Sequence, residues 1–126
     1  MNVGTLCSHR HPFVHTCVQE IKGGVESLNI RVVEHWDYQV GGGLVDDVHY
    51  DCDSVITIVC LLEAADEGGV FRTFEADDTH LEHHLEVGDS VCFVSHKYHN
   101  VTPVTGGKRR SLIVELWQCE KGQLNR

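Results

Sequence analysis

The amino-acid sequence predicts a mainly β protein, a sandwich or barrel of short strands that follows a single N-terminal helix. Two observations lead to this fold class. From Asn29 onward, apolar and polar residues alternate with a period of two in short runs. Glycine-rich or polar turn sequences separate the runs, and we find no internal repeat or linker in the 126 residues. We therefore expect one domain over residues 1–126, with its core at about 30–118.

Each element is predicted from its own pattern. The expected helix covers 12–22, where apolar residues recur at helical spacing until two glycines follow. The first strand, 29–38, alternates from Ile30 to Tyr38, and the glycines at 41–43 end it. The remaining expected strands, in chain order, are 50–62, 70–75, 81–85, 91–94, 100–105 and 109–117.

Charge and cysteine content restrict the function classes. The formal net charge of -9 argues against a nucleic acid or an anionic membrane as partner, because an acidic surface repels phosphate. There is no signal-peptide core and no apolar run that could span a membrane. None of the six cysteines is in C-x-x-C spacing, so we expect a cytoplasmic, reduced protein. Because six is an even number, a disulfide-bonded alternative stays open.

The stretch HYDCDSVITIVCLL, from His49 to Leu62, joins two metal-ligand types to an apolar run. In a strand, His49 and Asp51 would face one way, and Asp53, Val55, Thr57 and Val59 would share that face. His99 is the best placed third ligand, because it stands between the apolar run VCFV and a second extended run. Two histidines and one carboxylate leave open positions on a metal, as in non-haem Fe(II) oxygenases.

Other histidines compete with this interpretation, since H-x-D pairs arise easily by chance in a chain with ten histidines. His96 lies three residues before His99 and is an alternative ligand. His83 and His84 stand in the charged stretch EHHLE, so we expect them to be solvated. The histidines at positions 9, 11 and 15 are expected on the surface.

Arg109 begins the last expected strand, ten residues after His99. Arg109, Ser111, Ile113 and Glu115 share one face of that strand, and the opposite face is more apolar. We therefore expect Arg109 to point inward, with Ser111 beside it. A buried arginine needs an anion, and its planar fork fits a carboxylate. The alternative is that Arg109 pairs with Glu115 or with another acidic residue.

These segments together resemble the Fe(II)/2-oxoglutarate-dependent dioxygenases, in particular their prolyl-4-hydroxylase-like branch. The shared motifs are HYDCDSVITIVCLL, the Gly-Gly and short strand of EGGVFRTFE, the Gly-Asp and apolar strand of VGDSVCFVSHKYH, and HNVTPVTGGKRRS. The last of them follows the pattern H-x-V-x-P-V-x-x-G-x-R-x-S and is long and specific. The resemblance runs from about Arg31 to Trp117, which is most of the chain.

The resemblance implies a double-stranded β-helix, a relative of the jelly roll, with one or a few helices ahead of it. The implied iron ligands and catalytic residues are His49, Asp51 and His99. The implied contacts to 2-oxoglutarate are Arg109 on the distal carboxylate, Ser111, Tyr38 and Thr57. Members of this branch carry more helix before the first strand, and those helices support the larger sheet. The shorter N-terminal segment here therefore raises two alternatives, a homodimer or an incomplete domain.

The implied activity is hydroxylation of a C–H bond, with Fe(II), 2-oxoglutarate and O2 as cofactors and ascorbate as a further candidate. The substrate would be a peptide residue of the prolyl type or a small molecule, and the products would include succinate and CO2. Two alternatives remain: a cupin-like metalloprotein that does not use 2-oxoglutarate, and a non-catalytic binding domain of the same fold. Arg109 and Ser111 count against the first alternative, and the complete ligand set counts against the second.

Overall fold

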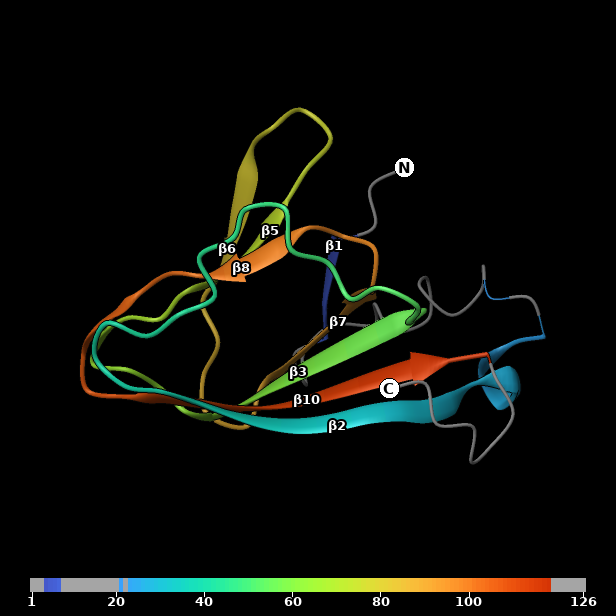
Figure 1. Cartoon of the computed structure of the whole chain (residues 1–126), viewed down its shortest axis with the longest axis horizontal. Coiled ribbons are helices and arrows are strands. Elements are labelled where there is room, and N and C mark those ends of the chain that lie inside the picture. Colours follow the sequence, from blue (N-terminus) through green and yellow to red (C-terminus); the bar gives the residue numbers. More distant parts are fainter. Residues whose placement is uncertain (1–3, 8–20, 22, 119–126) are drawn as a thin grey trace.

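The structure, a computed structural model, describes residues 4–7, 21 and 23–118, which form antiparallel sheets in two layers (Figure 1). The five-stranded sheet has the order β1 (Gly4–Cys7), β7 (Ser90–Val94), β3 (Ile56–Glu63), β10 (Arg109–Trp117) and β2 (Asn29–Tyr38). The three-stranded sheet has the order β6 (His80–His83), β5 (Phe71–Phe74) and β8 (His99–Val101). A short pair joins β4 (Glu67–Gly68) to β9 (Val104–Gly106), and one turn of 3-10 helix covers Val25–Ser27.

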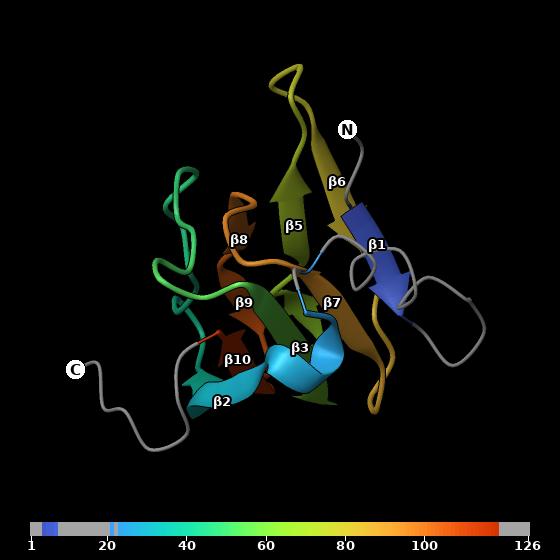
Figure 2. The ribbon, with the colours of Figure 1, turned by 90° about the vertical axis from the view of Figure 1, so that its right-hand side faces the viewer.

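Most strand predictions are confirmed. The predicted strands at 29–38 and 109–117 are β2 and β10, which pair from Arg109 opposite Tyr38 to Trp117 opposite Asn29. The smaller sheet lies over the inner face of the larger one (Figure 2), which agrees with the predicted double-stranded β-helix. The helix predicted at 12–22 lies outside the described residues apart from position 21.

Two strand predictions are wrong in detail, and two strands were not predicted. The strand expected at 50–62 begins only at Ile56, because turns occupy 52–53 and Asp53 has a φ of 66°. The extended run expected at 100–105 divides into β8 and β9 around Pro103, which has no backbone N–H for a ladder. Strands β1 and β4 were not predicted.

The main core cluster lies between the two sheets. Its buried members are Val59, Phe71, Val91, Phe93 and Val101. They come from both layers, so inward-facing residues of each sheet pack against those of the other. Burying one such side chain completely contributes about 1.5–3 kcal/mol, and the cluster holds the sheets together at the place where the candidate ligands meet.

The loop after β2 is held against β8 by a glycine and a backbone pair. A Cβ at Gly43 would lie 2.9 Å from the Val101 carbonyl oxygen, so a larger residue could not lie so close to β8. Next to it, the amides of Leu44 and Val101 donate to each other's carbonyls at 3.1 and 2.8 Å. Further along, the amide of His99 donates to the carbonyl of His49 at 3.0 Å. The loop that carries two candidate ligands is thus fixed beside the strand that carries the third.

Two further expectations concern membranes and cysteines. Within residues 4–7, 21 and 23–118, the structure has no helix with the length and apolar character needed to cross a bilayer. Cys52 and Cys60 carry free thiols. The cysteines at 17 and 119 lie outside the described residues, so the alternative of a disulfide is tested only in part.

Candidate metal centre

His49, Asp51 and His99 come together, with one ligand atom from each lying within 4.8 Å of the others. No other group of three such residues meets this condition in the described part of the chain. His49 Nε2 lies 3.2 Å from Asp51 Oδ1, and His99 Nε2 lies 3.7 Å from Asp51 Oδ2. His49 and Asp51 lie in the loop before β3 and not on a strand. Their side chains therefore come together through the loop conformation and not through the strand parity that the sequence analysis assumed.

The strand parity predicted beyond Asp51 is correct only in part. Thr57 and Val59 line the same cavity as His49 and Asp51, whereas Asp53 and Val55 do not. The physical reason is the turn at 52–53, where the left-handed backbone of Asp53 interrupts the alternation before β3 begins.

His99 is oriented and buried as a ligand would be. Its Nδ1 lies 2.9 Å from the Lys97 carbonyl oxygen, an acceptor, so Nδ1 carries the proton and Nε2 keeps its lone pair. The ring packs edge-on against Phe93, with the ring centroids 4.8 Å apart. Burial lowers the pKa of His99, more than the nearby Lys97 carbonyl and the Asp51 carboxylate raise it. The imidazole is therefore neutral near pH 7, the state that binds a metal.

Asp51 is fixed by two hydroxyl-bearing residues with fully buried side chains. The hydroxyl of Thr57 donates to Asp51 Oδ2 at 2.6 Å, and the hydroxyls of Thr57 and Ser95 are 2.9 Å apart. The amide of Asp51 donates to the carbonyl of Ser95 at 2.9 Å. Ser95 was not predicted, and no signal in the sequence distinguishes it from other serines at strand ends. The carboxylate thus has little freedom to turn away from the two histidines.

The donor set fits a small divalent cation of the first transition row. Two donors that bind one ion at ~2.1 Å and at right angles lie ~3 Å apart, close to the separations seen around Asp51. Two imidazoles and one carboxylate on one side of an ion form the set that suits Fe(II) with open positions. The alternative ligand His96 lies elsewhere, beside Tyr50 with ring centroids 5.8 Å apart.

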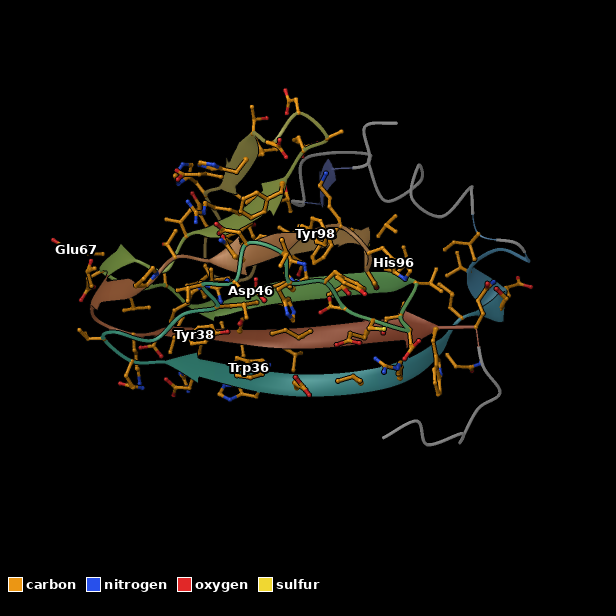
Figure 3. The ribbon with its side chains drawn as sticks, turned by 45° about the horizontal axis from the view of Figure 1, so that its top comes forward. Trp36, Tyr38, Asp46, Glu67, His96 and Tyr98 are labelled. Atoms are coloured by element: carbon orange, nitrogen blue, oxygen red, sulfur yellow. The ribbon has the colours of Figure 1, made fainter. Side chains whose placement is uncertain are left out.

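A cavity of about 320 Å³ opens next to the three ligands. All the predicted site residues line it: Tyr38, His49, Asp51, Thr57, His99, Arg109 and Ser111. Its apolar wall includes Val59, Phe71 and Val101. Sequence reasoning missed Trp36 and Glu34, although their spacing of two and four residues from Tyr38 on one strand would have indicated them. Figure 3 shows Trp36 and Tyr38 along β2, and their rings stack with centroids 5.9 Å apart.

Arg109 points into this cavity, as predicted, and is only 2 % exposed. Its Nη1 donates to the hydroxyl of Ser111 at 2.9 Å. Among the ion pairs of the described residues, none involves Arg109. Burial lowers the pKa of Arg109 and raises that of Tyr38, and the attraction between the two side chains opposes both shifts. A buried guanidinium without a carboxylate partner is suited to binding an external anion.

The alternative prediction, that Arg109 pairs with Glu115, is wrong. The Glu115 carboxylate accepts from Arg31 Nη1 at 2.8 Å and from the hydroxyl of Ser54 at 2.5 Å. The Arg31 guanidinium also lies over the Trp117 ring, 5.7 Å from its centroid. Arg31 on β2 therefore neutralises Glu115 on the inner face of β10, and Glu115 does not pair with Arg109.

The prediction that His83 is solvated is also wrong. His83 is 3 % exposed, because β6 pairs with β5 and places it opposite Phe71. Its Nε2 lies 2.8 Å from the hydroxyl of Thr73, and burial lowers the pKa of His83. Its neighbour His84 points to solvent, as expected. The sequence gives no clear signal for this burial, because Leu81, two residues earlier on the same face of the strand, is itself 45 % exposed.

Comparisons with known proteins show what the chain is similar to. No protein-family model and no curated protein matches it. Among solved structures, an oxidoreductase of the 2OG-Fe(II) oxygenase family from Burkholderia pseudomallei has a TM-score of 0.69 at 18 % identity, covering 81 % of this chain and 47 % of that one. A prolyl-4-hydroxylase from Pseudomonas putida has a TM-score of 0.57 at 22 % identity, and the match covers 69 % of this chain and 52 % of that one. A viral collagen prolyl hydroxylase from Paramecium Bursaria Chlorella virus-1, in its 2OG complex, has a TM-score of 0.63 at 18 % identity. That match covers 93 % of this chain and 79 % of the viral one.

These likenesses concern the fold, since all three identities are low. The chain spans about half the length of the first two structures. The predicted fold class is confirmed: the chain has the mainly β, double-stranded β-helix fold that it shares with 2OG-Fe(II) oxygenases and prolyl hydroxylases.

Proposed function

We propose that the protein is an Fe(II)- and 2-oxoglutarate-dependent dioxygenase that hydroxylates a C–H bond and releases succinate and CO2. One observation carries the proposal: the His49, Asp51 and His99 ligand set and the buried, carboxylate-free Arg109 line the same cavity. A metal that keeps open positions and an anion site in one cavity suit a cosubstrate with a chelating end and a second carboxylate.

His49, Asp51 and His99 would hold Fe(II), which supplies the activation of O2 and the oxidative chemistry when it is bound. The Lys97 carbonyl keeps the Nε2 of His99 free of a proton, and Thr57 holds Asp51 in place. These contacts orient the ligands before a metal arrives, which reduces the reorganisation that binding requires.

Arg109 would bind the distal carboxylate of 2-oxoglutarate. The Ser111 hydroxyl accepts a hydrogen bond from one N–H of Arg109, and the remaining N–H groups of Arg109 are left for the cosubstrate. Tyr38 lies opposite Arg109 in the β2–β10 ladder. The apolar wall of the cavity, which includes Val59 and Phe71, would limit the water around a bound carboxylate. Exclusion of water strengthens the attraction between the guanidinium and a carboxylate.

The proposed substrate is a peptide residue of the prolyl type or a small molecule. Two of the similar structures are prolyl hydroxylases by their descriptions, which supports the peptide alternative. The stacked rings of Trp36 and Tyr38 at the edge strand provide an aromatic surface next to the cavity for such a group.

The test is an anaerobic titration. Fe(II) is added to metal-free protein, then 2-oxoglutarate, and the visible spectrum is followed for the weak charge-transfer band of a chelated keto acid. We expect the band in the wild type and its loss in His99→Ala, while His96→Ala, the matched control, retains it. Iron binding without the band would favour a cupin-like metalloprotein. Binding of neither would favour a non-catalytic domain of this fold. Release of succinate with candidate prolyl peptides then tests the substrate.

A further inference from the structure

His49 is the least buried of the three candidate ligands. Its side chain is 36 % exposed, against 8 % for Asp51 and 6 % for His99. Asp51 and His99 each form a hydrogen bond with a residue outside the ligand set, whereas the His49 ring lies in hydrogen-bond contact with Asp51 itself. The position of His49 therefore depends on the backbone of residues 44–51, which we call the ligand loop.

The ligand loop lies along β8, the strand that carries the third ligand. The amides of His99 and Val101 donate to carbonyls of the loop at 3.0 and 2.8 Å. The amide of Thr102, just beyond β8, points the other way and donates to the Val70 carbonyl at 3.0 Å. The segment between the two loop bonds, 45–48, leads directly into the first metal ligand, so its conformation determines where that ligand lies.

A turn in this segment precedes His49. Asp46, labelled in Figure 3, accepts a hydrogen bond on Oδ1 from the amide of Val48 at 3.0 Å, an arrangement typical of turns that begin at aspartate. The next residue, Asp47, reaches β8, where its Oδ1 accepts from Asn100 Nδ2 at 2.7 Å. A side-chain hydrogen bond thus ties the turn to β8 two residues before His49.

Asn100 can form this contact in one orientation only. Its side chain is 1 % exposed, and both ends of its amide have partners. Arg72 Nε, on β5, donates to Asn100 Oδ1 at 2.9 Å, while Asn100 Nδ2 donates to Asp47. An arginine only donates and a carboxylate only accepts, so the amide cannot turn over. The three side chains link β5, β8 and the ligand loop in one chain of hydrogen bonds.

We propose that Asn100 is a positioning residue for the metal centre, whose hydrogen bond to Asp47 fixes the turn and thereby holds His49 within reach of the other two ligands. A metal needs all three ligands in place, so its affinity falls in proportion to the fraction of the protein in which the turn is docked. The effect on Fe(II) rests on the proposed function, whereas the fixing of the loop does not.

The first measurement is amide hydrogen exchange of the metal-free full chain, followed residue by residue in proton–nitrogen spectra. The His99 and Val101 amides report undocking of the ligand loop, and the Thr102 amide reports the opposite side of the strand. In Asn100→Asp, two carboxylates face each other across the contact. We expect exchange at the first two amides to accelerate by about tenfold or more and exchange at Thr102 to stay as in the wild type.

A double variant reverses donor and acceptor. In Asp47→Asn/Asn100→Asp, the amide at position 47 donates to the carboxylate at position 100, which still accepts from Arg72. Net charge and side-chain sizes match the wild type, so exchange should return to within about threefold of the wild-type rates.

Two single variants complete the set. Asp47→Ala removes the acceptor at an exposed position without burying a charge, so it should accelerate the same two amides even if Asn100→Asp does not fold. Asp78→Asn is the matched control, because it removes one charge at an exposed turn outside the ligand loop. It should exchange as the wild type does.

The second measurement is Fe(II) affinity by anaerobic calorimetry. Asn100→Asp should bind Fe(II) about tenfold or more weakly, the usual cost of losing a group that orients a metal ligand. Its added negative charge alone would attract a cation more strongly, so charge and positioning predict opposite changes. The double variant and Asp78→Asn should bind nearly as the wild type does.

Four results would overturn the proposal: no change of exchange at His99 and Val101, equal acceleration at Thr102, no recovery in the double variant, or faster exchange with wild-type Fe(II) affinity. The last result would leave Asn100 with a structural role only. A wild type that binds no Fe(II) would refute the proposed function, and the exchange rates would still decide whether Asn100 fixes the loop. The two failures are therefore distinguishable.

Discussion

Replacing Thr57 by valine tests whether this residue serves the metal or the cosubstrate. Thr57→Val keeps the shape of the side chain and removes the hydroxyl that donates to Asp51 Oδ2 at 2.6 Å and lies 2.9 Å from the Ser95 hydroxyl. Thr57 and Ser95 are both fully buried, so water cannot replace the lost contacts. A hydrogen bond to a charged group contributes about 1.5–3 kcal/mol.

We therefore expect the variant to bind Fe(II) about 10–100-fold more weakly, the usual cost of losing a partner of a metal ligand. The free energy of unfolding of the metal-free protein should fall by about 2 kcal/mol, which lowers the Tm by on the order of 10 °C. The matched control is Thr57→Ser, which keeps the hydroxyl and loses one methyl group, at a cost of about 0.8 kcal/mol in stability. The control should bind Fe(II) nearly as the wild type does.

The assay is an anaerobic titration with Fe(II), followed by 2-oxoglutarate at saturating metal. Wild-type metal affinity in Thr57→Val would refute the inference that Thr57 positions Asp51. If that variant instead lost 2-oxoglutarate affinity with its metal affinity intact, the direct cosubstrate contact implied by the family resemblance would be supported. The two roles therefore predict opposite results.

Three further predictions concern the same cavity. Arg109→Ala should weaken 2-oxoglutarate binding at least tenfold and leave Fe(II) affinity unchanged, while Arg110→Ala, a control that removes the ion pair to Glu63, should leave both unchanged, as measured by calorimetry. His99→Ala should lower Fe(II) affinity by well over tenfold, and normal binding would exclude His99 as a ligand. Burial lowers the pKa of His83, so the unfolded chain takes up a proton below about pH 6.5 that the folded chain resists, and stability should fall as the pH falls. Urea unfolding at several pH values should show a shallower decline in His83→Gln, and an unchanged decline would contradict the assignment.

The sequence was sufficient to predict most of the fold because period-two alternation is a local property. Strands β2 and β10 have the predicted bounds, and the inward face of β10 follows directly from residue parity. Parity failed where the backbone left the extended region, at Asp53 with its φ of 66°, so β3 begins later than expected. Aspartate and serine also favour turns, so the polar cluster at 51–54 was a signal for this turn that the strand prediction passed over.

Only the tertiary structure shows which residues of the candidate site contact one another. The sequence by itself named His49, Asp51, His99 and Arg109, because residue type and motif spacing are visible in one dimension. Only the fold showed that they line one cavity, since the ligands approach through the pairing of the loop before β3 with β8.

The tertiary structure also decided the partners of the charged and polar groups. Glu115 pairs with Arg31, which leaves Arg109 free of a carboxylate, and Thr57 donates to Asp51. His83, expected in solvent, is buried because β6 pairs with β5 and places it opposite Phe71. Hydrogen bonds and ion pairs depend on distances between segments far apart in the chain, and a sequence pattern records only which groups are present and which face of a strand they share.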